Sequence, residues 1–401
     1  MVEEKLNVNI FIGSLCGGGA EKVVSELARN QPQDINLCLS LISQKNKVYQ
    51  VGDVQLCVYD ENASVNILSK LLSKIRPNII YMMYQHYLYL KRNEFAASVS
   101  FLTYNNTINM LVSRLLHLPT VVSIRNNISE EHGFSIFSTA QRLLLKICSP
   151  YLIVNSEDNK NWLINHYHLD SNKCICIYNP KDIDSIHTLA NIPINDDFFN
   201  TDETILLTVG RLSHQKGHVH LLRIFRSLRE IIPCRLVICG IGPLESSLKE
   251  MADKMHISDY VLFTGFCDNP YMYMKNTDIF VFTSLFEGQP NALIEALICG
   301  CPIISADCDY GPREILGYGR YGILTKKLDG KIDNPLTTPL TCAERDMYEG
   351  IVYLIQNPSE RKRFSSLTAD QTPLFDKNKC VNMYYSVFRA VINGDSVVNI
   401  K

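Results

Sequence analysis

Two glutamates stand eight positions apart in the stretch SLFEGQPNALIEALICGCPIIS, which runs from Ser284 to Ser305. Glu287 precedes a glycine, whereas Glu295 lies inside an apolar run that has the composition of a helix. Acidic side chains are uncommon inside apolar runs unless they have a partner. Carboxylates accept hydrogen bonds from hydroxyl groups, which sugars and ribose offer. The spacing therefore indicates a polyol ligand, although for Glu295 alone a salt bridge beneath the surface is the alternative.

Two basic residues, Arg211 and Lys216, lie in the segment GRLSHQKGH (210–218), which follows a candidate strand. A guanidinium binds phosphate oxygens as a fork and an ammonium binds them as a point charge, so together they could hold a diphosphate. The alternative is two solvated surface charges. Further turns with glycine follow later candidate strands, at GIGP (240–243) and GFCDNP (265–270).

Three consecutive glycines, Gly17, Gly18 and Gly19, connect the first candidate strand to the first candidate helix. Glycines at this place let backbone N–H groups approach an anion at the start of the helix. The spacing is not G-x-G-x-x-G, and no acidic partner for a ribose follows at the expected distance. A tight strand–helix turn that binds no ligand is therefore the alternative.

The elements that would position these residues fall into two similar halves. Continuous apolar strands alternate with amphipathic helices, which is typical of a parallel sheet covered on both faces. In doubly wound sheets ligands bind beyond the carboxyl ends of the strands, so we expect the site in the cleft between the two sheets. The expected strands are 7–13, 35–43, 78–83, 120–124 and 151–156 in the first half, and 204–210, 235–240, 260–265, 278–284 and 302–306 in the second.

Residues 178–203 are rich in Pro, Asn and Asp, which is the composition of a linker. A chain of 401 residues is also too long for one ordinary domain. The sequence therefore predicts two doubly wound, Rossmann-like α/β domains, at residues 1–185 and 186–375. A last helical segment, 376–401, is expected to pack back toward the N-terminal domain.

The amino-acid composition limits which partners the protein binds and which cell compartment it occupies. The chain is 46% hydrophobic with a net charge of −2, so no basic field points to nucleic acid. Fourteen scattered cysteines without a C-x-x-C pair are typical of reduced thiols rather than of disulfides or zinc ligands. The N-terminus has no signal-peptide pattern, and no stretch reaches the roughly 18 uncharged apolar residues of a spanning helix. We expect a cytoplasmic protein with at most peripheral contact to the inner face of the cytoplasmic membrane.

Together, GRLSHQKG (210–217) and TSLFEGQPNALIEALICGCPIISAD (283–307) resemble the retaining glycosyltransferase family 4, with its E-x7-E motif and its GT-B fold. GGGAE near the start, NSEDNKNWL (155–163) and IYNP (177–180) extend the resemblance over most of the chain. The segment DCDYGPREIL (307–316) is similar to enzymes of bacterial surface-polysaccharide synthesis. The resemblance implies that the first domain binds the acceptor and the second binds a nucleotide sugar.

The resemblance also implies roles for single residues. Glu287, Arg211 and Lys216 would be catalytic, with Glu287 on the hydroxyls of the donor sugar and the two cations on the diphosphate. Glu295 would bind the ribose, and a backbone amide in the Gly17–Gly19 loop would reach the same phosphates. The other residues of the implied donor site are Gly240, Phe266, Gly288, Gln289 and Asn291.

The implied reaction moves a hexose or an N-acetylhexosamine, with retention, from a nucleotide-diphosphate sugar, with UDP as the expected nucleotide. The implied acceptor is a saccharide linked to polyprenyl diphosphate, in the synthesis of a bacterial polysaccharide, O-antigen or capsule. No metal or other cofactor is expected. Two alternatives are a non-hydrolysing sugar-nucleotide epimerase on the same fold and a non-catalytic subunit of a polysaccharide assembly complex. The E-x7-E stretch and the Arg211/Lys216 loop argue against the epimerase. Intact Glu287, Glu295, Arg211 and Lys216 argue against a non-catalytic subunit, but a histidine missing from the first domain keeps that alternative open.

One departure from the family concerns the acceptor side. Many members carry a histidine at the end of an N-domain strand, where this chain has Arg125, Asn126 and Asn127. These three residues are the implied acceptor contacts. Arg125 could bind an acceptor phosphate or could pair with Glu130 or Glu131.

Two patterns suggest metal sites but have simpler explanations. DCD (307–309) and DID (182–184) resemble the D-x-D motif of the other glycosyltransferase fold, yet in a chain with two Rossmann-like halves they favour loop carboxylates. His214, His218 and His220 are spaced like ligands, but no carboxylate or cysteine accompanies them in the sequence.

Membrane contact is an open alternative for two basic and apolar segments. One contains Arg142 and Lys146 beside a leucine run, and KLLSKIR contains Lys70, Lys74 and Arg76. Such surfaces dock on anionic lipid. An ordinary amphipathic helix that packs on its sheet would have the same pattern.

Overall fold

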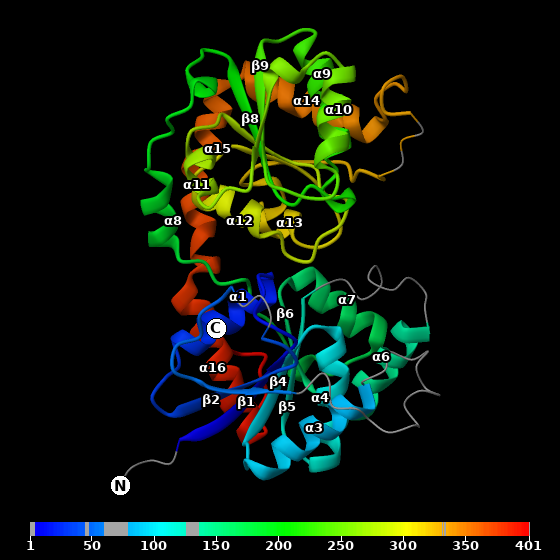
Figure 1. The fold of residues 1–401 in the computed structure, drawn as a ribbon, viewed down its shortest axis with the longest axis vertical. Helices are drawn as coiled ribbons and strands as arrows, with labels where there is room; N and C mark the ends of the chain where they lie inside the picture. Colours follow the sequence, from blue (N-terminus) through cyan, green and yellow to red (C-terminus); the bar gives the residue numbers. More distant parts are fainter. Residues whose placement is uncertain are drawn as a thin grey trace. The chain divides into compact units, whose positions relative to one another are not determined.

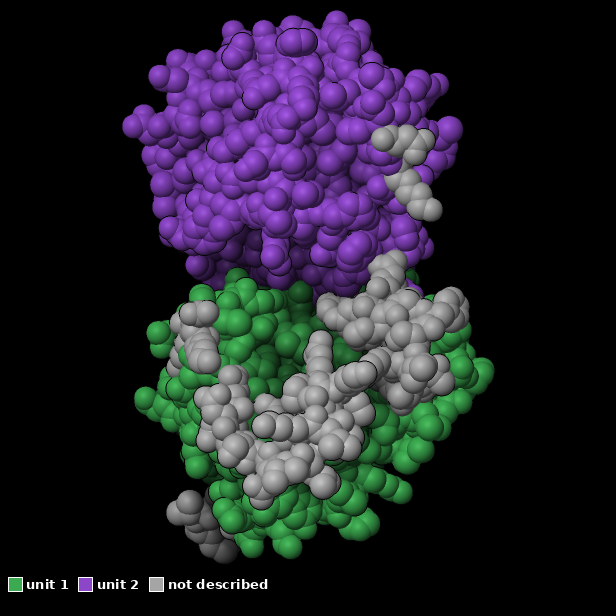
Figure 2. Space-filling model, turned by 45° about the vertical axis from the view of Figure 1, so that its right-hand side comes forward, with its two compact units in different colours: residues 1–180, 377–401 green, residues 181–376 purple. Residues whose placement is uncertain are grey.

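The computed structural model describes residues 5–44, 48–59, 79–125, 136–330, 332 and 334–400. The chain divides into two compact units, which are coloured separately in Figure 2. Unit 1 contains residues 1–180 and 377–401, and unit 2 contains residues 181–376. Each unit has one parallel β-sheet with helices on its faces (Figure 1), so the expected pair of Rossmann-like α/β domains is confirmed.

Unit 1 is built on a seven-stranded sheet in the order β3-β2-β1-β4-β5-β6-β7, in which all neighbouring strands are parallel. Its central strands are almost entirely buried, as expected for a parallel sheet covered on both faces. The strand order reverses between β1 and β4, which is the topological switch point of this sheet. The strands are β1 (Leu6–Ile12), β2 (Ile35–Leu41), β3 (Gln55–Val58), β4 (Ala97–Phe101), β5 (Thr120–Ile124), β6 (Tyr151–Val154) and β7 (Cys174–Cys176).

Helices cover both faces of this sheet. Helices α1 and α16 pack together on one face, where the Tyr385 hydroxyl of α16 donates to the Leu27 carbonyl of α1 at 2.5 Å. Helices α3 and α4 pack on the opposite face around Phe11, and α6 and α7 continue that layer. The helices of unit 1 are α1 (Gly19–Arg29), α3 (Ile79–Arg92), α4 (Thr103–Leu116), α6 (Ile136–Cys148), α7 (Glu157–Tyr167), the 3-10 turn η1 (Ser171–Lys173) and α16 (Lys377–Asn393).

The expected strand at 78–83 is wrong, because this segment lies in helix α3 from Ile79 onward. Buried Met82, His86 and Leu90 recur every fourth residue and so share one face of the helix. A short apolar run fits a strand or a helix equally well, and its length decides between them. The strand that lies beside β1 on the side away from β2 is instead β4, ASVSF, whose two serines made it less apolar and concealed it.

Unit 2 contains a six-stranded parallel sheet in the order β10-β9-β8-β11-β12-β13. From β8 the chain adds β9 and β10 on one side of the sheet, and it then adds β11, β12 and β13 on the other side. The switch point therefore lies between β8 and β11. The five strands expected in the second half are confirmed within two residues at each end. The strands are β8 (Thr204–Val209), β9 (Cys234–Cys239), β10 (Val261–Gly265), β11 (Ile279–Phe282), β12 (Ile303–Ala306) and β13 (Ile323–Thr325).

The helices of unit 2 form two groups. Helices α9, α10 and α14 share one hydrophobic core with strands β8, β9, β11 and β12. Helices α8, α11, α12 and α15 pack among themselves as a second group. The helices are α8 (Ile183–Ala190), α9 (His218–Arg229), α10 (Glu245–Lys254), α11 (Pro270–Lys275), α12 (Asn291–Ile298), α13 (Pro312–Ile315), α14 (Cys342–Gln356) and α15 (Pro358–Gln371). The 3-10 turns are η2 (Asp197–Phe199), η3 (His214–Lys216), η4 (Ser258–Tyr260), η5 (Gly317–Gly319) and η6 (Thr372–Phe375).

The structure places the division between the units at Pro180, five residues before the expected boundary at 185. Lys181 forms a parallel β-bridge with Asp376, so the first and last residues of unit 2 are paired. Helix α8 packs against α11 and α12, which makes part of the expected linker an ordinary element of unit 2. Helix α16 belongs to unit 1, where Arg389 binds both carboxylate oxygens of Asp34 at 2.7 and 2.8 Å.

All 14 cysteines lie in the described part of the chain and are free thiols. Among the described residues, no helix is long and apolar enough to cross a membrane.

Candidate active site

The switch point of unit 2 gathers the charged residues that the sequence singled out. The loop after β8 carries Arg211 and Lys216, and the loop after β11 carries Glu287. Strands β8 and β11 are parallel neighbours, so both loops leave the same edge of the sheet. In open α/β sheets ligands bind at this edge, next to the switch point.

Short contacts fasten the two loops to each other. The Leu285 N–H donates to the Gln215 carbonyl at 2.8 Å, and the Thr283 hydroxyl donates to the Lys216 carbonyl at 2.9 Å. Gly217 has a φ of 64°, and a Cβ built on it would lie 2.1 Å from the Thr283 carbonyl oxygen. The loops therefore meet backbone to backbone at a position that only glycine fits.

This contact places Lys216 against Glu287. The distance between Lys216 Nζ and Glu287 Oε1 is 2.5 Å, and the two side chains are 19% and 9% exposed. The Lys216 ammonium also lies 5.5 Å from the centre of the Phe282 ring. The structure thus joins two of the three predicted catalytic residues in one ion pair that is largely shielded from water.

Arg211 is the third predicted catalytic residue, and its side chain is exposed. No hydrogen-bond or ion-pair partner of this guanidinium is found among the described residues. Gly240, at the end of β9, has a φ of 147°, and a Cβ there would lie 2.0 Å from the Gly210 carbonyl oxygen. The close packing of the loops after β8 and β9 thus requires glycine at position 240. Arg211 directly follows Gly210, whose backbone is fixed by this packing.

Glu295 lies on α12, and its partner is Lys181. The distance from Lys181 Nζ to Glu295 Oε1 is 2.5 Å, and the lysine side chain is 1% exposed while the glutamate is 12% exposed. The salt bridge that the sequence offered as the alternative for Glu295 is therefore present. Sequence reasoning did not identify Lys181, because a partner 114 residues away leaves no spacing signal.

The remaining predicted donor residues lie around the same edge. Gly288 and Gln289 connect Glu287 to α12, and Asn291 is the first residue of that helix. Phe266 follows β10 and is strongly exposed. The structure gives no direct contact between Phe266 and the Lys216–Glu287 pair.

In unit 1, the three glycines lie after β1, next to the switch point of that sheet. Gly17 has a φ of 113°, Gly18 is the N-cap of α1 and Gly19 is its first residue. No side chain caps this helix. The first N–H groups of a helix lack partners within the helix, which favours an anion there. The Glu21 carboxylate of the first turn lies against this start, with Oε2 2.2 Å from the place of a Gly18 Cβ, so the contact with a phosphate stays a prediction.

Arg125 follows β5 and is buried in unit 1. Its guanidinium donates to the Tyr384 hydroxyl at 2.8 Å and to the Asn179 side-chain oxygen, and it lies 5.9 Å from the centre of the Phe101 ring. This position favours a structural role, between β5 and α16, over the expected contact with an acceptor phosphate. The expected acceptor residues Asn126 and Asn127, and the alternative partners Glu130 and Glu131, lie outside the described residues.

The D-x-D patterns are accounted for by local contacts. Arg313 binds both oxygens of Asp307 at 2.9 Å, and Lys327 binds Asp309. Asp182 is the N-cap of α8 and accepts from the Ser185 N–H at 3.1 Å. Asp307, Asp309 and Asp182 are therefore loop or cap carboxylates, as the sequence favoured, whereas Asp184 lies in the first turn of α8.

The three histidines line a cavity of about 190 Å³ beside the loop after β8, together with Leu285. His220 Nδ1 lies 2.9 Å from a Glu344 oxygen. Burial lowers the pKa of His218 to about 4, with a further contribution from the charge of Lys216, so His218 is neutral near pH 7. Among the described residues, no group of three histidine, cysteine or acidic side chains could hold a metal ion.

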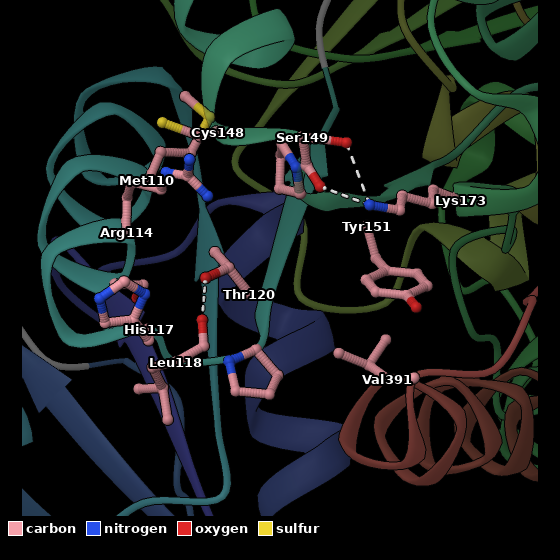
Figure 3. Close-up of a pocket in the computed structure, with 14 residues that line it drawn as sticks. Met110, Arg114, His117, Leu118, Thr120, Cys148, Ser149, Tyr151, Lys173 and Val391 are labelled. Carbon is pink, nitrogen blue, oxygen red and sulfur yellow. Dashed lines mark hydrogen bonds between the residues drawn. The ribbon is translucent and has the colours of Figure 1, made fainter.

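A larger cavity, of about 310 Å³, lies in unit 1 (Figure 3). It is bordered by the first residues of β5 and β6, so it opens at the edge of the sheet opposite the glycine loop. Arg114 and His117 approach it from the end of α4, while Lys173 donates to the carbonyl and hydroxyl oxygens of Ser149 at 3.1 and 3.0 Å. This cavity is therefore separate from the candidate donor site.

Comparison with known proteins relates this arrangement to a family. Residues 194–331 match the model described as glycosyl transferases group 1. This match includes the loops after β8 and β11 and helix α12.

Two curated relatives are similar to the chain in sequence. The N-acetylgalactosamine-N,N'-diacetylbacillosaminyl-diphospho-undecaprenol 4-alpha-N-acetylgalactosaminyltransferase of Campylobacter jejuni is 28% identical, over 93% of this chain and 96% of its own length. An uncharacterized glycosyltransferase of Methanocaldococcus jannaschii is 33% identical over 61% of this chain. The match covers 66% of the M. jannaschii protein, just under two thirds of its length.

A solved structure is similar to the chain in fold. The Anabaena protein HepE in complex with UDP and glucose has a TM-score of 0.72 and covers 96% of this chain, and the match spans 100% of HepE. The two sequences are 16% identical, so this likeness concerns the fold.

Proposed function

We propose that the chain is a group 1 glycosyltransferase of the GT-B fold and that it transfers a hexose or an N-acetylhexosamine from a UDP-sugar with retention of configuration. The observation that supports the donor part most strongly is the convergence of Arg211, Lys216 and Glu287 at the switch point of unit 2. UDP is proposed as the nucleotide because HepE, which shares the fold, was solved with it.

Arg211 and Lys216 would stabilise the leaving group, which is the nucleoside diphosphate. As the bond from the anomeric carbon to the diphosphate breaks, the sugar becomes oxocarbenium-like and negative charge grows on the diphosphate. Fixed cations aimed at that charge are usually a large term in catalysis. Arg211 is exposed without a protein partner among the described residues, and Lys216 is held against the loop after β11, so both can contribute.

Glu287 would bind hydroxyls of the transferred sugar. Its carboxylate has about four acceptor positions, of which the ion pair with Lys216 uses one. Lys216 likewise has three N–H donors, so it can keep Glu287 and also bind a phosphate oxygen. The pair would thus join the sugar subsite to the diphosphate subsite.

We propose attack from the face that the diphosphate leaves. The acceptor oxygen forms the new bond to the anomeric carbon while the bond to the diphosphate oxygen breaks. The acceptor hydroxyl proton passes to an oxygen of the leaving diphosphate. This step needs no enzyme nucleophile and agrees with retention.

For the acceptor, we propose a saccharide linked to polyprenyl diphosphate in bacterial polysaccharide synthesis. The C. jejuni relative, which aligns over almost its whole length, is named for a diphospho-undecaprenol acceptor. Such an acceptor lies in a membrane, so the enzyme would have to approach lipid.

Helices α4 and α6 of unit 1 would supply the membrane contact. Helix α6 packs inward through Leu145, yet Leu143 and Ile147 are exposed, as is Leu115 on α4. Lys146 is exposed on α6, and Arg114 borders the cavity of Figure 3 between the ends of the two helices. Apolar side chains flanked by cations are suited to the surface of an anionic bilayer. The second segment proposed from sequence, with Lys70, Lys74 and Arg76, lies outside the described residues.

Vesicle flotation tests the membrane contact. The protein should float with vesicles that contain phosphatidylglycerol, less so at high salt, and the double variant Leu143→Glu with Ile147→Glu should float much less. Ile231→Glu changes an exposed apolar residue of unit 2 and is the matched control. Equal losses in both variants, or no binding by the wild type, would refute a contact through α6.

The reaction itself is tested by incubating the purified protein with a panel of UDP-hexoses and UDP-N-acetylhexosamines and a polyprenyl-diphosphate saccharide. Mass spectrometry should detect an acceptor lengthened by one sugar together with UDP, and NMR of the product should show the anomeric configuration of the donor. Inversion would refute the proposed mechanism. Epimerisation of a UDP-sugar without an acceptor would favour the epimerase alternative.

A further inference from the structure

Lys181 has one of the largest fully buried side chains in the described part of unit 2. Lysine is rarely buried unless it is paired, because an ammonium loses its hydration there. Its Nζ lies 2.5 Å from Glu295 Oε1, and its side chain is 1% exposed. The charge of Lys181 is therefore directed at a residue of the E-x7-E pair.

The backbone of Lys181 is fixed as firmly as its side chain. Its N–H donates to the Phe375 carbonyl at 2.7 Å, and it forms a β-bridge with Asp376. Phe375 ends the turn η6, which packs against α12, the helix that carries Glu295. The turn η6 thus fixes the backbone of Lys181 and also packs against the helix that carries Glu295.

The glutamate is not buried to the same degree. Glu295 is 12% exposed, and no second hydrogen-bond donor to its carboxylate is found among the described residues. A carboxylate has about four acceptor positions, and the contact with Lys181 Nζ uses only one oxygen, Oε1. The other oxygen therefore keeps its capacity to accept hydroxyl hydrogens.

A structural ion pair of the same unit differs in this respect. Arg223 and Glu344 are 3% and 0% exposed, and both Glu344 oxygens are bonded within the protein. Nothing of the Glu344 carboxylate remains for a ligand. In the Lys181–Glu295 pair the lysine is buried, whereas the glutamate is partly exposed and has one oxygen, Oε2, that Lys181 does not bind. This arrangement is expected where one residue orients the side chain that contacts a ligand.

We propose that Lys181 is a positioning residue of the donor site. It holds Oε1 of Glu295 so that Oε2 is directed at the hydroxyls of the nucleotide ribose. The inference rests on the proposed function, because it assumes that Glu295 faces a ribose. It adds a residue that precedes α8 and lies far in sequence from both donor loops.

Calorimetric titration with UDP and with 2′,3′-dideoxy-UDP tests this role. Wild-type protein should prefer UDP by at least about tenfold, as expected for a charged hydrogen bond. Lys181→Met and Glu295→Gln should each remove most of this preference, and the double variant should lose no more than either single variant. Lys181→Arg keeps the charge and should restore part of it. Lys254→Met breaks an exposed ion pair of unit 2 and should leave the preference intact.

The outcomes separate two levels of the proposal, the contact of Glu295 with the ribose and the positioning of Glu295 by Lys181. If Lys181→Met retains the preference while Glu295→Gln loses it, Lys181 is only structural and the inference is wrong. If Glu295→Gln also retains the preference, Glu295 does not bind the ribose and both levels fail. Wild-type protein that does not bind UDP overturns the proposed donor and the inference with it. Should Lys181→Met fail to fold, Lys181→Gln, which keeps a polar group but removes the charge, carries the same comparison, and an undiminished preference for UDP in that variant would overturn the inference.

Discussion

Lys216 and Glu287 form an ion pair across the switch point of unit 2, with 2.5 Å between Nζ and Oε1. The lysine comes from the loop after β8 and the glutamate from the loop after β11. The sequence assigned them to different parts of one ligand, the diphosphate and the sugar. Their direct contact means that a substitution of either one alters the charge environment of the other.

Replacement of Lys216 by Met should reduce both turnover and stability. Turnover should fall about 10²–10³-fold, as for the loss of one preorganised donor to a transition state. The free energy of unfolding should also fall, because Glu287 is only 9% exposed and would lose its partner. Turnover assays and urea unfolding measure the two effects.

The double variant Lys216→Met with Glu287→Gln separates these effects. It should recover stability, since no unpaired charge remains, but it should not recover turnover. Recovery of both would mean that the pair only stabilises the loops and does not contact the donor.

Activity should not require a divalent metal ion. If Arg211, Lys216 and the N–H groups of the glycine loop neutralise the diphosphate, turnover should be unchanged in excess EDTA. Full loss that Mn²⁺ or Mg²⁺ restores would contradict this expectation and would direct attention back to Asp307 and Asp309.

Gly217→Ala should destabilise unit 2 more than Gly265→Ala does. Both glycines have φ between 64° and 69°, but a Cβ at Gly217 would lie 2.1 Å from the Thr283 carbonyl oxygen, and nothing lies within 4 Å of one at Gly265. Gly265→Ala should therefore cost only the left-handed strain, about 1–2 kcal/mol. Gly217→Ala should cost more, because the loop after β11 must move. Equal unfolding free energies for the two variants would contradict the close contact of the loops.

Glu344 should make unit 2 sensitive to acid. Burial raises its pKa, but hydrogen bonds from His220 and Arg223 lower it more, and the pKa falls from 4.5 to about 2. The folded state thus binds fewer protons than the unfolded state in this range. The stabilisation is complete above pH 4.5 and should be lost as the pH falls from about 4.5 toward 2.

Glu344→Gln tests this contribution. Glutamine still suits the capping box that Thr341 and Glu344 form at the start of α14, so the change removes mainly the charge. The free energy of unfolding at pH 7 should fall by about 3–5 kcal/mol, as for a broken buried pair, and its pH dependence below 4.5 should weaken. Glu250→Gln, in an exposed pair, should change little.

The sequence predicted most of unit 2 because its strands are long apolar runs separated by clear turns. It failed at α3, where a short apolar run fits both kinds of element, and at β4, where serines dilute the hydrophobic signal. Arg211, Lys216 and Glu287 could be identified because they directly follow predicted strands. Lys181 could not, because its partner is fixed by the packing of α12 and η6 rather than by any local pattern.

Calorimetric titration of UDP into the wild type, Arg211→Ala and Glu287→Gln tests the donor site most directly. UDP should bind the wild type with one molecule per chain. Arg211→Ala should lose about 1.5–3 kcal/mol of binding free energy, the amount typical of a charged hydrogen bond, because the guanidinium would contact the diphosphate. Glu287→Gln should bind UDP at least almost as well as the wild type while turnover falls, since UDP carries no sugar for it to contact and Lys216 keeps its charge for the diphosphate. Unchanged affinity in Arg211→Ala, or an equal loss in Glu287→Gln, would contradict the proposed donor site.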